Sequence, residues 1–404
     1  LANVAAFLFT LPFFLFSATA GQFADKYEKS MLMRRIKLLE VGLMSFAAIA
    51  LLTRQYSLLL FVLFLMGCQS ALFGPVKYAY LPQKLHTDEL VGGNALVEAG
   101  TYIAIIVGLI IGVETVDFES DRQTMLAFVL VGVSCIGYLA SRQVPITEAV
   151  DPSLKINFNT WQETWKIVRF AREEKSVFIS ILGISWFWFF GSAMTIQMPA
   201  YAADIINGNE SVITSFLVAF AVGVGLGSLL CERMSGHRIE LGLVPFGSIG
   251  MSVFAIDLYF AQPEAAGAAV ESVADFISRS GSWRILLDLA LLGVFGGFYS
   301  VPLYALIQKR SHRQHLSRIV AANNIINALF MVGAVVFSII ILKLGFSIPE
   351  LFLFIAALNA VVAIYIYSML PEFLIRFLAW LIISVVYRIH PLGIESIPKA
   401  GPAV

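Results

Sequence analysis

The segment Gly21-Gln-Phe-Ala-Asp-Lys-Tyr-Glu-Lys-Ser-Met-Leu-Met-Arg-Arg35 decides how this chain folds, because it is a short basic stretch between two apolar runs, 2–20 and 36–52. A turn between two membrane helices needs a small residue where the helices separate and an acid near a helix end. It also needs several cations, which stay at the anionic cytoplasmic surface. The cations here, with the next one along the chain, are Lys26, Lys29, Arg34, Arg35 and Lys37. We therefore predict two membrane helices joined on the cytoplasmic side.

Composition assigns the rest of the chain to the membrane as well. Of its 404 residues, 59% are hydrophobic and 13% are charged, which is far too apolar for a soluble globular protein. The net charge is zero, so no overall field indicates nucleic acid as a partner. Cys68, Cys135 and Cys231 lie in separate apolar runs, without the spacing of a disulfide framework or a metal site. No metal or cofactor is expected, and no phosphate loop of the G-x-x-x-x-G-K-S/T type suggests direct use of ATP.

Eleven apolar runs are long enough to cross a bilayer core of about 30 Å as helices. Cations support this list, because nearly all of them fall on one side if the 21–37 loop is cytoplasmic. Only Arg54, Arg122, Arg279, Arg284 and Lys343 fall on the other side. The expected spans are 2–20, 37–53, 58–74, 95–116, 124–141, 176–197, 211–231, 241–261, 283–304, 319–342 and 351–370.

The basic turn resembles the loop between the second and third helices of major facilitator superfamily transporters, with the rough pattern G-x-L-A-D-R/K-x-G-R/K-R/K. Gly21, Ala24, Asp25, Lys26 and Lys29 fit this pattern, whereas a glutamate replaces the usual second glycine. The resemblance implies an all-α membrane protein of that superfamily's fold, with two pseudo-symmetric helical bundles and about eleven of twelve transmembrane helices present. We expect the first helix to lie upstream of Leu1. The alternative is an ordinary basic loop of some other polytopic protein.

The long cytoplasmic loop divides five spans from six. We expect an N-terminal transmembrane bundle at 1–141, a cytoplasmic linker at 142–175 and a C-terminal bundle at 176–370. In the linker, Phe158, Trp161, Trp165 and Val168 recur at helical spacing among cations. This pattern is typical either of a helix lying along the lipid headgroups or of a plain linker helix packed on both bundles.

Internal repetition suggests where gates lie. The segment 227–240 is a degraded repeat of 21–35 at the matching loop of the second half. Inside-gate candidates are therefore Gly21, Asp25, Lys26, Glu232, Arg233 and Glu240. We expect Asp25 to approach the helix that begins near Arg318, where a carboxylate meets exposed backbone N–H groups.

On the other side of the membrane, Arg284 and Asp288 are four residues apart, and Asp257 lies in the preceding span. They form either an outside gate or a static surface pair. The glycine pairs 108/112, 223/227 and 293/297 have the spacing that allows close helix approach.

The segment Gly67-Cys-Gln-Ser-Ala-Leu-Phe-Gly-Pro-Val-Lys-Tyr-Ala-Tyr-Leu-Pro82, followed by Asn94-Ala-Leu-Val-Glu-Ala-Gly-Thr101, indicates which transporter this is. We expect its Gly-Pro pair to end a helix and Lys77 to stand at the cytoplasmic mouth, where an ammonium holds a phosphate. The run resembles the bacterial lysophospholipid transporter family, and the residues that match are Pro75, Lys77, Tyr78, Asn94, Glu98 and Thr101. The alternative is that Lys77 is an ordinary loop cation with Glu98 as its structural partner.

A second resemblance covers 183–250 and 393–404, which are similar to the family variant fused to a phospholipid-recycling acyltransferase. Residues 371–404 would then be the start of a glycerolipid acyltransferase domain, cut off before its catalytic box. The resemblance implies a bacterial inner-membrane protein that takes lysophospholipids from the outer to the inner leaflet for re-acylation by the fused domain. Its partners would be lysophospholipid and membrane lipid. No catalytic residue is assigned in this chain. The rival functions are transport of another small solute and a membrane anchor for the acyltransferase.

A lysophospholipid needs a polar route for its headgroup, so amides inside the bundle are further candidates. Gln69, Asn323 and Asn327 are the amides chosen for substrate contact, with Asn323 and Asn327 on one helix face. Amides in membrane helices also serve as interhelical contacts. For the aromatic run 186–190, the alternatives are a groove for the acyl tail and outward contact with lipid, and we expect lipid contact.

Overall fold

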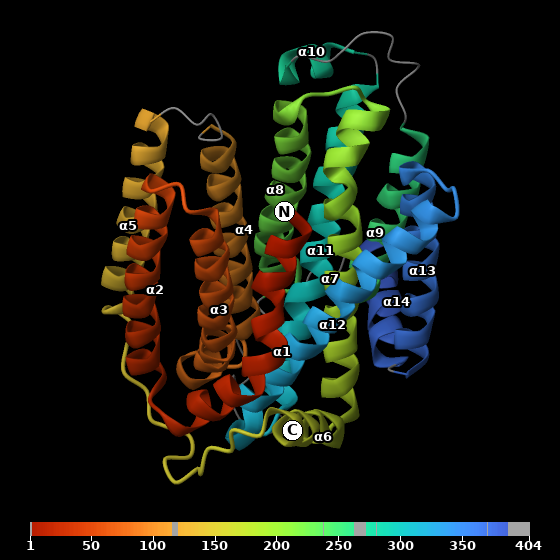
Figure 1. The fold of residues 1–404 in the computed structure, drawn as a ribbon. Helices are drawn as coiled ribbons and strands as arrows, with labels where there is room; N and C mark the ends of the chain where they lie inside the picture. The colour runs from red at the N-terminus through yellow and green to blue at the C-terminus, as the bar shows by residue number, and fades with distance from the viewer. Residues whose placement is uncertain are drawn as a thin grey trace.

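The computed structural model describes residues 2–114, 120–236, 238–261, 272–279, 281–369 and 371–386, and Figure 1 shows that they fold into helices joined by short connections. The first half contains α1 (Ala2–Lys26), α2 (Lys29–Leu52), α3 (Tyr56–Lys84), α4 (Leu90–Glu114) and α5 (Ser120–Ser141), followed by the linker helix α6 (Thr160–Glu173). The second half contains α7 (Lys175–Ala200), the π-helix η1 (Tyr201–Ile205), α8 (Glu210–Met234), α9 (Leu243–Phe260), α10 (Val273–Ser278), α11 (Ser282–Arg310), the 3-10 turn η2 (Arg313–His315), α12 (Leu316–Lys343), α13 (Ile348–Met369) and α14 (Pro371–Val386).

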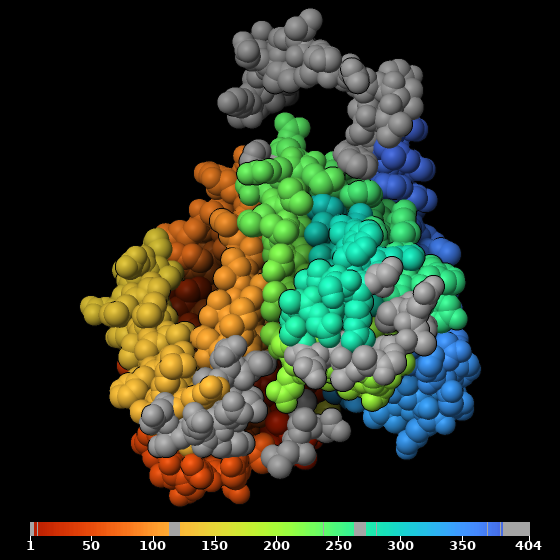
Figure 2. Space-filling model, turned by 90° about the horizontal axis from the view of Figure 1, so that it is seen from above, coloured from red at the N-terminus to blue at the C-terminus, as the bar shows by residue number. Residues whose placement is uncertain are grey.

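The long helices form two bundles, as the sequence predicts. Helices α1 to α5 make the first bundle and α7 to α13 the second (Figure 1). From above, the warm-coloured first half and the green-to-blue second half lie side by side (Figure 2). Helix α1 packs against α3 of its own half and α12 of the other, and α4 packs against α8. These two contacts, α1 with α12 and α4 with α8, join the halves.

Ten helices in the described part of the chain are long and apolar enough to cross a membrane. The sequence predicts eleven spans, and the difference is α2, which carries several charges in its first half. Helix α2 is nevertheless 24 residues long and packs lengthwise beside α3 and α5. Its charged half lies at the end where the basic loops gather, which we call the inner end; the opposite end, with α10, is the outer end (Figure 1).

The Gly74-Pro75 pair does not end a helix, which corrects the sequence-based expectation. Helix α3 continues through this pair to its end. A proline inside a helix removes one backbone hydrogen bond, and the neighbouring turns maintain the helix when packing holds them. Gly74 instead makes room for α12, because a Cβ there would lie 2.6 Å from Asn324 Nδ2. Lys77 and Tyr78 therefore belong to the last two turns of α3 and not to a loop.

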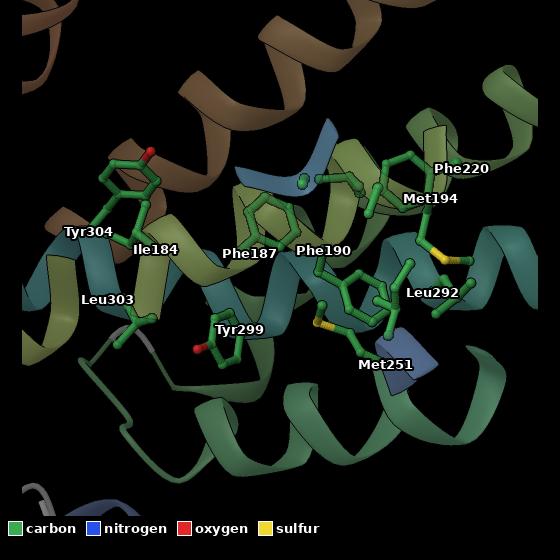
Figure 3. Close-up of a cluster of buried hydrophobic side chains, with 14 of the residues drawn as sticks. Ile184, Phe187, Phe190, Met194, Phe220, Met251, Leu292, Tyr299, Leu303 and Tyr304 are labelled. Carbon is green, nitrogen blue, oxygen red and sulfur yellow. The ribbon is translucent and has the colours of Figure 1, made fainter. Parts of the chain in front are cut away.

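The aromatic run 186–190 lies largely inside the protein, so the expectation that it faces lipid is wrong. Trp186, Phe187 and Phe190 are buried because α7 packs against α8, α11, α12 and α13. Phe187 and Phe190 join the apolar core of the second bundle, which Figure 3 shows between α7 and α11. The hydrophobic periodicity of this run could not indicate its burial, since a helix surrounded by other helices is apolar on every side.

Glycines bring α8 and α11 into close contact. Gly223 and Gly227 on α8 face Gly293 and Gly297 on α11, and a Cβ at Gly227 would clash with the backbone oxygen of Val294. The expected close approach therefore occurs for these two pairs. For the third pair, Gly108 and Gly112 on α4, no described residue beyond the chain neighbours and the helix's own nearby backbone has an atom within 4 Å of the ideal Cβ positions.

Helix α6 lies across the inner end and packs on α1, α7 and α12 (Figure 1). Ile167 and Ala171 face the bundles and are buried, whereas Trp161 and Trp165 are 81% and 72% exposed. The helix is thus packed on both halves, as the linker alternative predicts, and it keeps an aromatic face on the surface. Asn159 begins it by accepting a hydrogen bond from Gln162 N.

Candidate functional site

A buried cluster of polar and aromatic side chains joins the two halves near the inner end. The Tyr78 hydroxyl donates a hydrogen bond to Glu98 Oε1 at 2.5 Å. The Tyr78 ring stacks on Tyr304 of the other half, with ring centroids 4.7 Å apart and planes 1° from parallel. Three helices, α3, α4 and α11, supply these residues. Glu98 is buried two turns inside α4.

An amide pair crosses the same interface. Asn94 Nδ2 donates to Gln308 Oε1 at 2.6 Å, and Gln308 Nε2 donates back to Asn94 Oδ1 at 3.0 Å. Gln308 Nε2 also lies 3.1 Å from the backbone oxygen of Tyr78. Hydrogen bonds of this kind contribute about 1 kcal/mol each net, because both partners also bond to water when exposed. The two halves are therefore joined by contacts weak enough to exchange for contacts to a polar ligand.

Lys77 lies beside this cluster. Its Nζ is 4.6 Å from the centroid of the Tyr78 ring, a cation–π distance. Tyr78, not Lys77, is the hydrogen-bond partner of the Glu98 carboxylate. The structure thus brings together Lys77, Tyr78, Asn94 and Glu98, four of the residues chosen from sequence.

The other three amides have different surroundings. Asn323 is buried beside Tyr304, and its Oδ1 has no partner within the described ranges. Asn327 Oδ1 accepts from Ser185 on α7 at 2.7 Å, an interhelical contact inside the second bundle. Gln69 faces α2, where its Nε2 donates to Glu40 at 2.8 Å. Only Asn323 of these three adjoins the central cluster.

Tyr304 and Gln308 were missed by sequence reasoning. Both lie near the inner end of α11, a helix that is buried over most of its length. A uniformly apolar span gives no periodic signal that distinguishes one polar residue from another. Their spacing of four residues, which places them on one helix face, was the available signal.

A buried ion pair closes the inner end. Asp25, in the last turn of α1, accepts a hydrogen bond from Arg318 Nε at 2.8 Å, and the two side chains are 0% and 4% exposed. Arg318 stands in the first turn of α12, so the carboxylate also meets the positive end of that helix. Gly21 allows this approach, because a Cβ there would lie 2.9 Å from the Cα of Arg318. The structure thus places Gly21 and Asp25 against α12.

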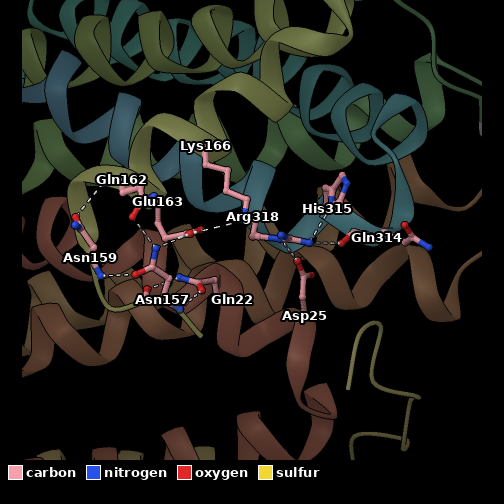
Figure 4. A network of polar contacts seen from close by, with 10 residues as sticks. All are labelled: Gln22, Asp25, Asn157, Asn159, Gln162, Glu163, Lys166, Gln314, His315 and Arg318. Atoms are coloured by element: carbon pink, nitrogen blue, oxygen red, sulfur yellow. Dashed lines mark hydrogen bonds and ion pairs between the residues drawn. The ribbon is translucent and has the colours of Figure 1, made fainter. Parts of the chain in front are cut away.

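The linker helix holds Arg318 from the other side (Figure 4). Arg318 Nη2 donates to Gln314 O at 2.9 Å and lies 2.8 Å from His315 Nδ1. The Phe170 ring of α6 stacks on His315 at 4.3 Å and lies under the guanidinium at 5.2 Å. Gln22 and Asn157 exchange two hydrogen bonds, at 2.8 and 2.9 Å, which fasten the linker to α1. Phe170 of α6 and Gln22 of α1 therefore connect the linker to both sides of the ion pair.

Glu28 fastens the linker a second time. Its carboxylate begins α2 by accepting from the backbone amides of Ser30 and Met31 and also accepts from Thr147 N of the linker. Burial alone would raise the pKa of Glu28, but these backbone hydrogen bonds lower it to about 2. The glutamate that replaces the usual glycine thus works as a helix cap and as an anchor for the linker.

The remaining inside-gate candidates do not form one cluster. The Glu232 carboxylate on α8 adjoins Gly92 in the first turn of α4. Arg233, which follows Glu232 on α8, is exposed. Glu240 Oε1 accepts from Gly242 N at 3.1 Å within its own loop. Lys26 Nζ lies 5.8 Å from the centroid of the Tyr27 ring.

At the outer end, the structure brings together the three charged residues that the sequence singled out. Arg284 Nε donates to Asp257 at 3.0 Å, and a second Arg284 nitrogen bonds the other oxygen of the same carboxylate. Asp288, one turn further along α11, is buried.

Comparison with known proteins agrees with this architecture. The family model described as "Major Facilitator Superfamily" matches residues 1–329. The chain belongs to the Major Facilitator Superfamily. It is a multi-pass transporter of the bacterial inner membrane, with relatives among bacterial transporters. The protein named lysophospholipid transporter LplT of Klebsiella pneumoniae subsp. pneumoniae is 26% identical over 329 residues, which cover 80% of this chain and 75% of that protein. The protein of that name in Photorhabdus laumondii subsp. laumondii is 25% identical over 311 residues, covering 75% and 69%.

Solved structures share the fold at much lower sequence identity. The human organic anion transporter MFSD10 superposes with a TM-score of 0.71 at 11% identity, covering 90% of this chain and 83% of that one. The superfamily transporter FucP in the outward conformation gives 0.68 at 12% identity, covering 91% and 89%. A bacterial homologue of the iron transporter ferroportin in an outward-facing state gives 0.58 at 14% identity, covering 94% and 90%. At these identities the likeness concerns the fold alone.

Proposed function

We propose that this chain moves lysophospholipids from the outer to the inner leaflet of the inner membrane by alternating access between its two bundles. The observation that carries the proposal is the buried cluster of Tyr78, Glu98, Tyr304, Asn94 and Gln308, to which both halves contribute. The relatives named lysophospholipid transporter support the choice of substrate.

The chemistry of the cluster suits a single-tailed lipid. A headgroup needs hydrogen-bond donors and acceptors to replace water, whereas the acyl tail needs only an apolar environment. Asn94 and Glu98 offer these polar groups from α4, and Lys77 adds an ammonium for the phosphate. Gln69, Asn323 and Asn327 were chosen for the same role; of these, Asn323, with its unpartnered Oδ1, has the surroundings that fit best.

In this mechanism, the Asp25–Arg318 pair is the inner gate. Gly21 lets α1 and α12 meet, and Asp25 holds them together through Arg318 and the start of α12. Glu232 beside the first turn of α4 is the corresponding contact of the second half, with Lys26, Arg233 and Glu240 as neighbouring charges. Opening requires both contacts to break.

The test is uptake of a fluorescent lysophospholipid by proteoliposomes that contain the purified chain, compared with protein-free liposomes. We expect protein-dependent transfer to the inner leaflet. Lys77→Gln should slow it about tenfold, since a lost charge-assisted hydrogen bond costs about 1.5 kcal/mol. Lys84→Gln, an exposed cation at the end of the same helix, is the matched control and should transport normally. Equal transfer with and without protein would reject the substrate and leave a facilitator of another solute.

We also infer that residues 371–404 lead into a glycerolipid acyltransferase, which would re-acylate the transported lipid. The inference is supported by the similarity of 393–404 to the lead-in of such enzymes. Helix α14 covers the first part of this segment, and residues 387–404 lie outside the described ranges. Reading the gene downstream of the codon for Val404 tests it: a frame without an acyltransferase box would contradict the inference.

A further inference from the structure

A cavity at the inner end lies between the two halves, next to the Asp25–Arg318 pair. Its volume is about 600 Å³. The first half lines it with Lys29 of α2 and with the end of α3, and the linker adds residues 146–150. The second half lines it with Arg313 of η2 and with the start of α12. None of the five residues of the central cluster lines this cavity, so it is a separate site.

Lys29 is the unusual residue of the cavity wall. It is 1% exposed, and its ammonium has no hydrogen-bond partner within the described part of the chain. The two nearest carboxylates along the chain are engaged elsewhere, since Asp25 bonds Arg318 and Glu28 accepts from backbone amides. Their charges act on Lys29 only through space. A buried charge without a bonded partner is strongly unfavourable. An anion in the cavity would supply the partner that Lys29 lacks.

The opposite wall offers two further groups that attract anions. Arg313 lines the cavity and is exposed, and a guanidinium binds a phosphate with two parallel hydrogen bonds. The first turn of α12 lines the cavity through Leu316 and Ser317, and no side chain caps it. Uncapped amides at the positive end of a long helix bind anions. The start of α12 therefore adds to the attraction of the two cations.

The charges on the cavity wall favour an anion as the occupant. Besides Lys29 and Arg313, the ionisable side chains that line it are Lys84 and Glu148, which are both exposed. These two are opposite in sign and cancel in the sum. The wall therefore keeps two cations in excess, one from each half of the molecule.

We propose that this cavity binds a small phosphorylated metabolite from the cytoplasm, with its phosphate group between Lys29 on one side and Arg313 and the start of α12 on the other. Phosphate has the charge and the several acceptor oxygens that these donors require. The cavity is larger than a phosphate group, and Ala79, Pro82 and Ile146 give it apolar wall for a small organic group.

Bound phosphate would link the two halves across the inner gate, because its donors come from both of them. It should therefore stabilise the closed inner end in addition to the Asp25–Arg318 pair. This stabilising effect rests on the proposed function, whereas the binding itself does not.

The test is equilibrium dialysis of radiolabelled inorganic phosphate against the purified full chain in detergent, at constant ionic strength and without lysophospholipid. We expect saturable binding of one phosphate per chain. Lys29→Gln should weaken it about tenfold, the usual effect of losing a charge-assisted hydrogen bond. Lys155→Gln, an exposed cation of the linker that does not line the cavity, is the matched control and should bind as wild type does.

A second variant covers the case in which Lys29→Gln does not fold. Arg313 is exposed, so Arg313→Gln should fold normally and should also weaken binding about tenfold. A wild-type chain without saturable phosphate binding would overturn the proposal. Binding as strong as wild type in both Lys29→Gln and Arg313→Gln would overturn it as well. Because no lysophospholipid is present, these results are the same whether or not the chain transports that lipid.

Hydrogen–deuterium exchange tests whether the anion links the halves. Phosphate should slow exchange in the first turn of α12 in the wild-type chain and not in Lys29→Gln, although Lys29 belongs to the other half. Phosphate binding without this protection would show that the anion does not link the halves. The same protection in phosphatidylglycerol nanodiscs without phosphate, and not in phosphatidylcholine nanodiscs, would identify a lipid headgroup as the occupant and overturn the choice of a soluble ligand.

Discussion

At the scale of single residues, Asp25 and Arg318 are the clearest case of a contact that does two tasks. They are an ion pair removed from water, and they join two helices from different halves. Removing one member of such a pair costs about 3–5 kcal/mol, because the other charge stays buried without a partner. We therefore expect Asp25→Asn to open the inner end. A cysteine placed at Ser317, which is buried, should then react with a water-soluble maleimide in a background that lacks the three native cysteines.

Two further variants isolate the cause. Asp151→Asn removes a carboxylate from the linker, whose Oδ1 accepts the Ser153 hydroxyl within the described part of the chain, and should leave labelling unchanged. Asp25→Asn combined with Arg318→Met removes the unpaired charge and should reduce labelling again. Unchanged labelling in Asp25→Asn would show that this pair does not hold the inner end closed.

Glu28 gives a pH-dependent prediction. Its pKa of about 2 in the folded chain lies below the ordinary value of 4.5. The ionised Glu28 carboxylate therefore stabilises the folded chain fully above pH 4.5. This stabilisation disappears as the pH falls toward 2, where Glu28 binds a proton in the folded chain as well. We expect Glu28→Gln to unfold at lower denaturant concentration than wild type at neutral pH, with the gap closing over this range. The measurement is denaturant unfolding in detergent micelles at a series of pH values.

The matched control is Glu148→Gln, an exposed carboxylate on the same linker. It should follow the wild-type curve. Parallel curves for Glu28→Gln and wild type across the whole range would contradict the capping role.

The role of a single residue was predictable from sequence where its charge or polarity set it apart from the neighbouring residues. Asp25 lies in a basic turn, and its approach to Arg318 could be expected because an acid at one helix end suits the positive start of another. The amides Gln69, Asn323 and Asn327 cannot be told apart in the sequence. In the structure, Gln69 contacts Glu40, Asn323 contacts Tyr304 and Asn327 contacts Ser185. Which face of an apolar helix is turned inward depends on the packing of all its neighbours, which no local pattern records.

At the scale of elements, the contact between α8 and α11 gives the sharpest contrast. A Cβ at Gly227 would clash with the backbone of α11, whereas a Cβ at Gly108 meets no atom of another described helix within 4 Å. We expect Gly227→Ala to destabilise the chain by about 1–3 kcal/mol, the usual effect of overpacking. Gly108→Ala, in a helix interior, should be neutral or stabilise by up to about 1 kcal/mol. Unfolding in detergent measures both.

The same experiment tests whether the spacing of glycines is informative by itself. Both residues belong to pairs with identical spacing in sequence, and only the structure separates them. Equal destabilisation by Gly227→Ala and Gly108→Ala would mean that α4 has a close neighbour that the structure does not place there.

Two predictions about helices, one from a proline and one from an aromatic run, were wrong because of the packing of neighbouring helices. The Gly74-Pro75 pair reads as a helix end in isolation, but α3 continues because α1, α2 and α12 pack around it. The run 186–190 is typical of a lipid-facing surface, but α7 is enclosed by four helices. In both cases tertiary packing overrides a local preference of a few kcal/mol.

At the scale of the whole molecule, the composition and the side on which cations fall predict a membrane protein of many spans with a basic inner side, and the resemblance to the superfamily implies its two bundles. Apart from the approach of Asp25 to Arg318, the contacts between the bundles were not predictable, because their two sides lie far apart in the sequence, as in Asn94 and Gln308, which are 214 residues apart. Alternating access requires these contacts to form and break while each bundle moves as a unit. The central cluster must therefore differ in behaviour from equally buried polar contacts within one bundle.

A pair of crosslinks separates these two kinds of contact. In the variant Asn94→Cys with Gln308→Cys, a short reducible crosslinker between the two cysteines ties α4 to α11 across the halves. We expect crosslinking to stop the transport of lysophospholipid and reduction of the crosslink to restore it. Asn359→Cys with Ser248→Cys is the matched control, because Asn359 Nδ2 donates to Ser248 O at 2.9 Å within the second bundle. Crosslinking this pair should leave transport intact. Transport that continues with α4 and α11 tied together would mean that the halves do not separate at the cluster during the cycle, and the headgroup would then need a path that avoids Glu98 and Tyr78.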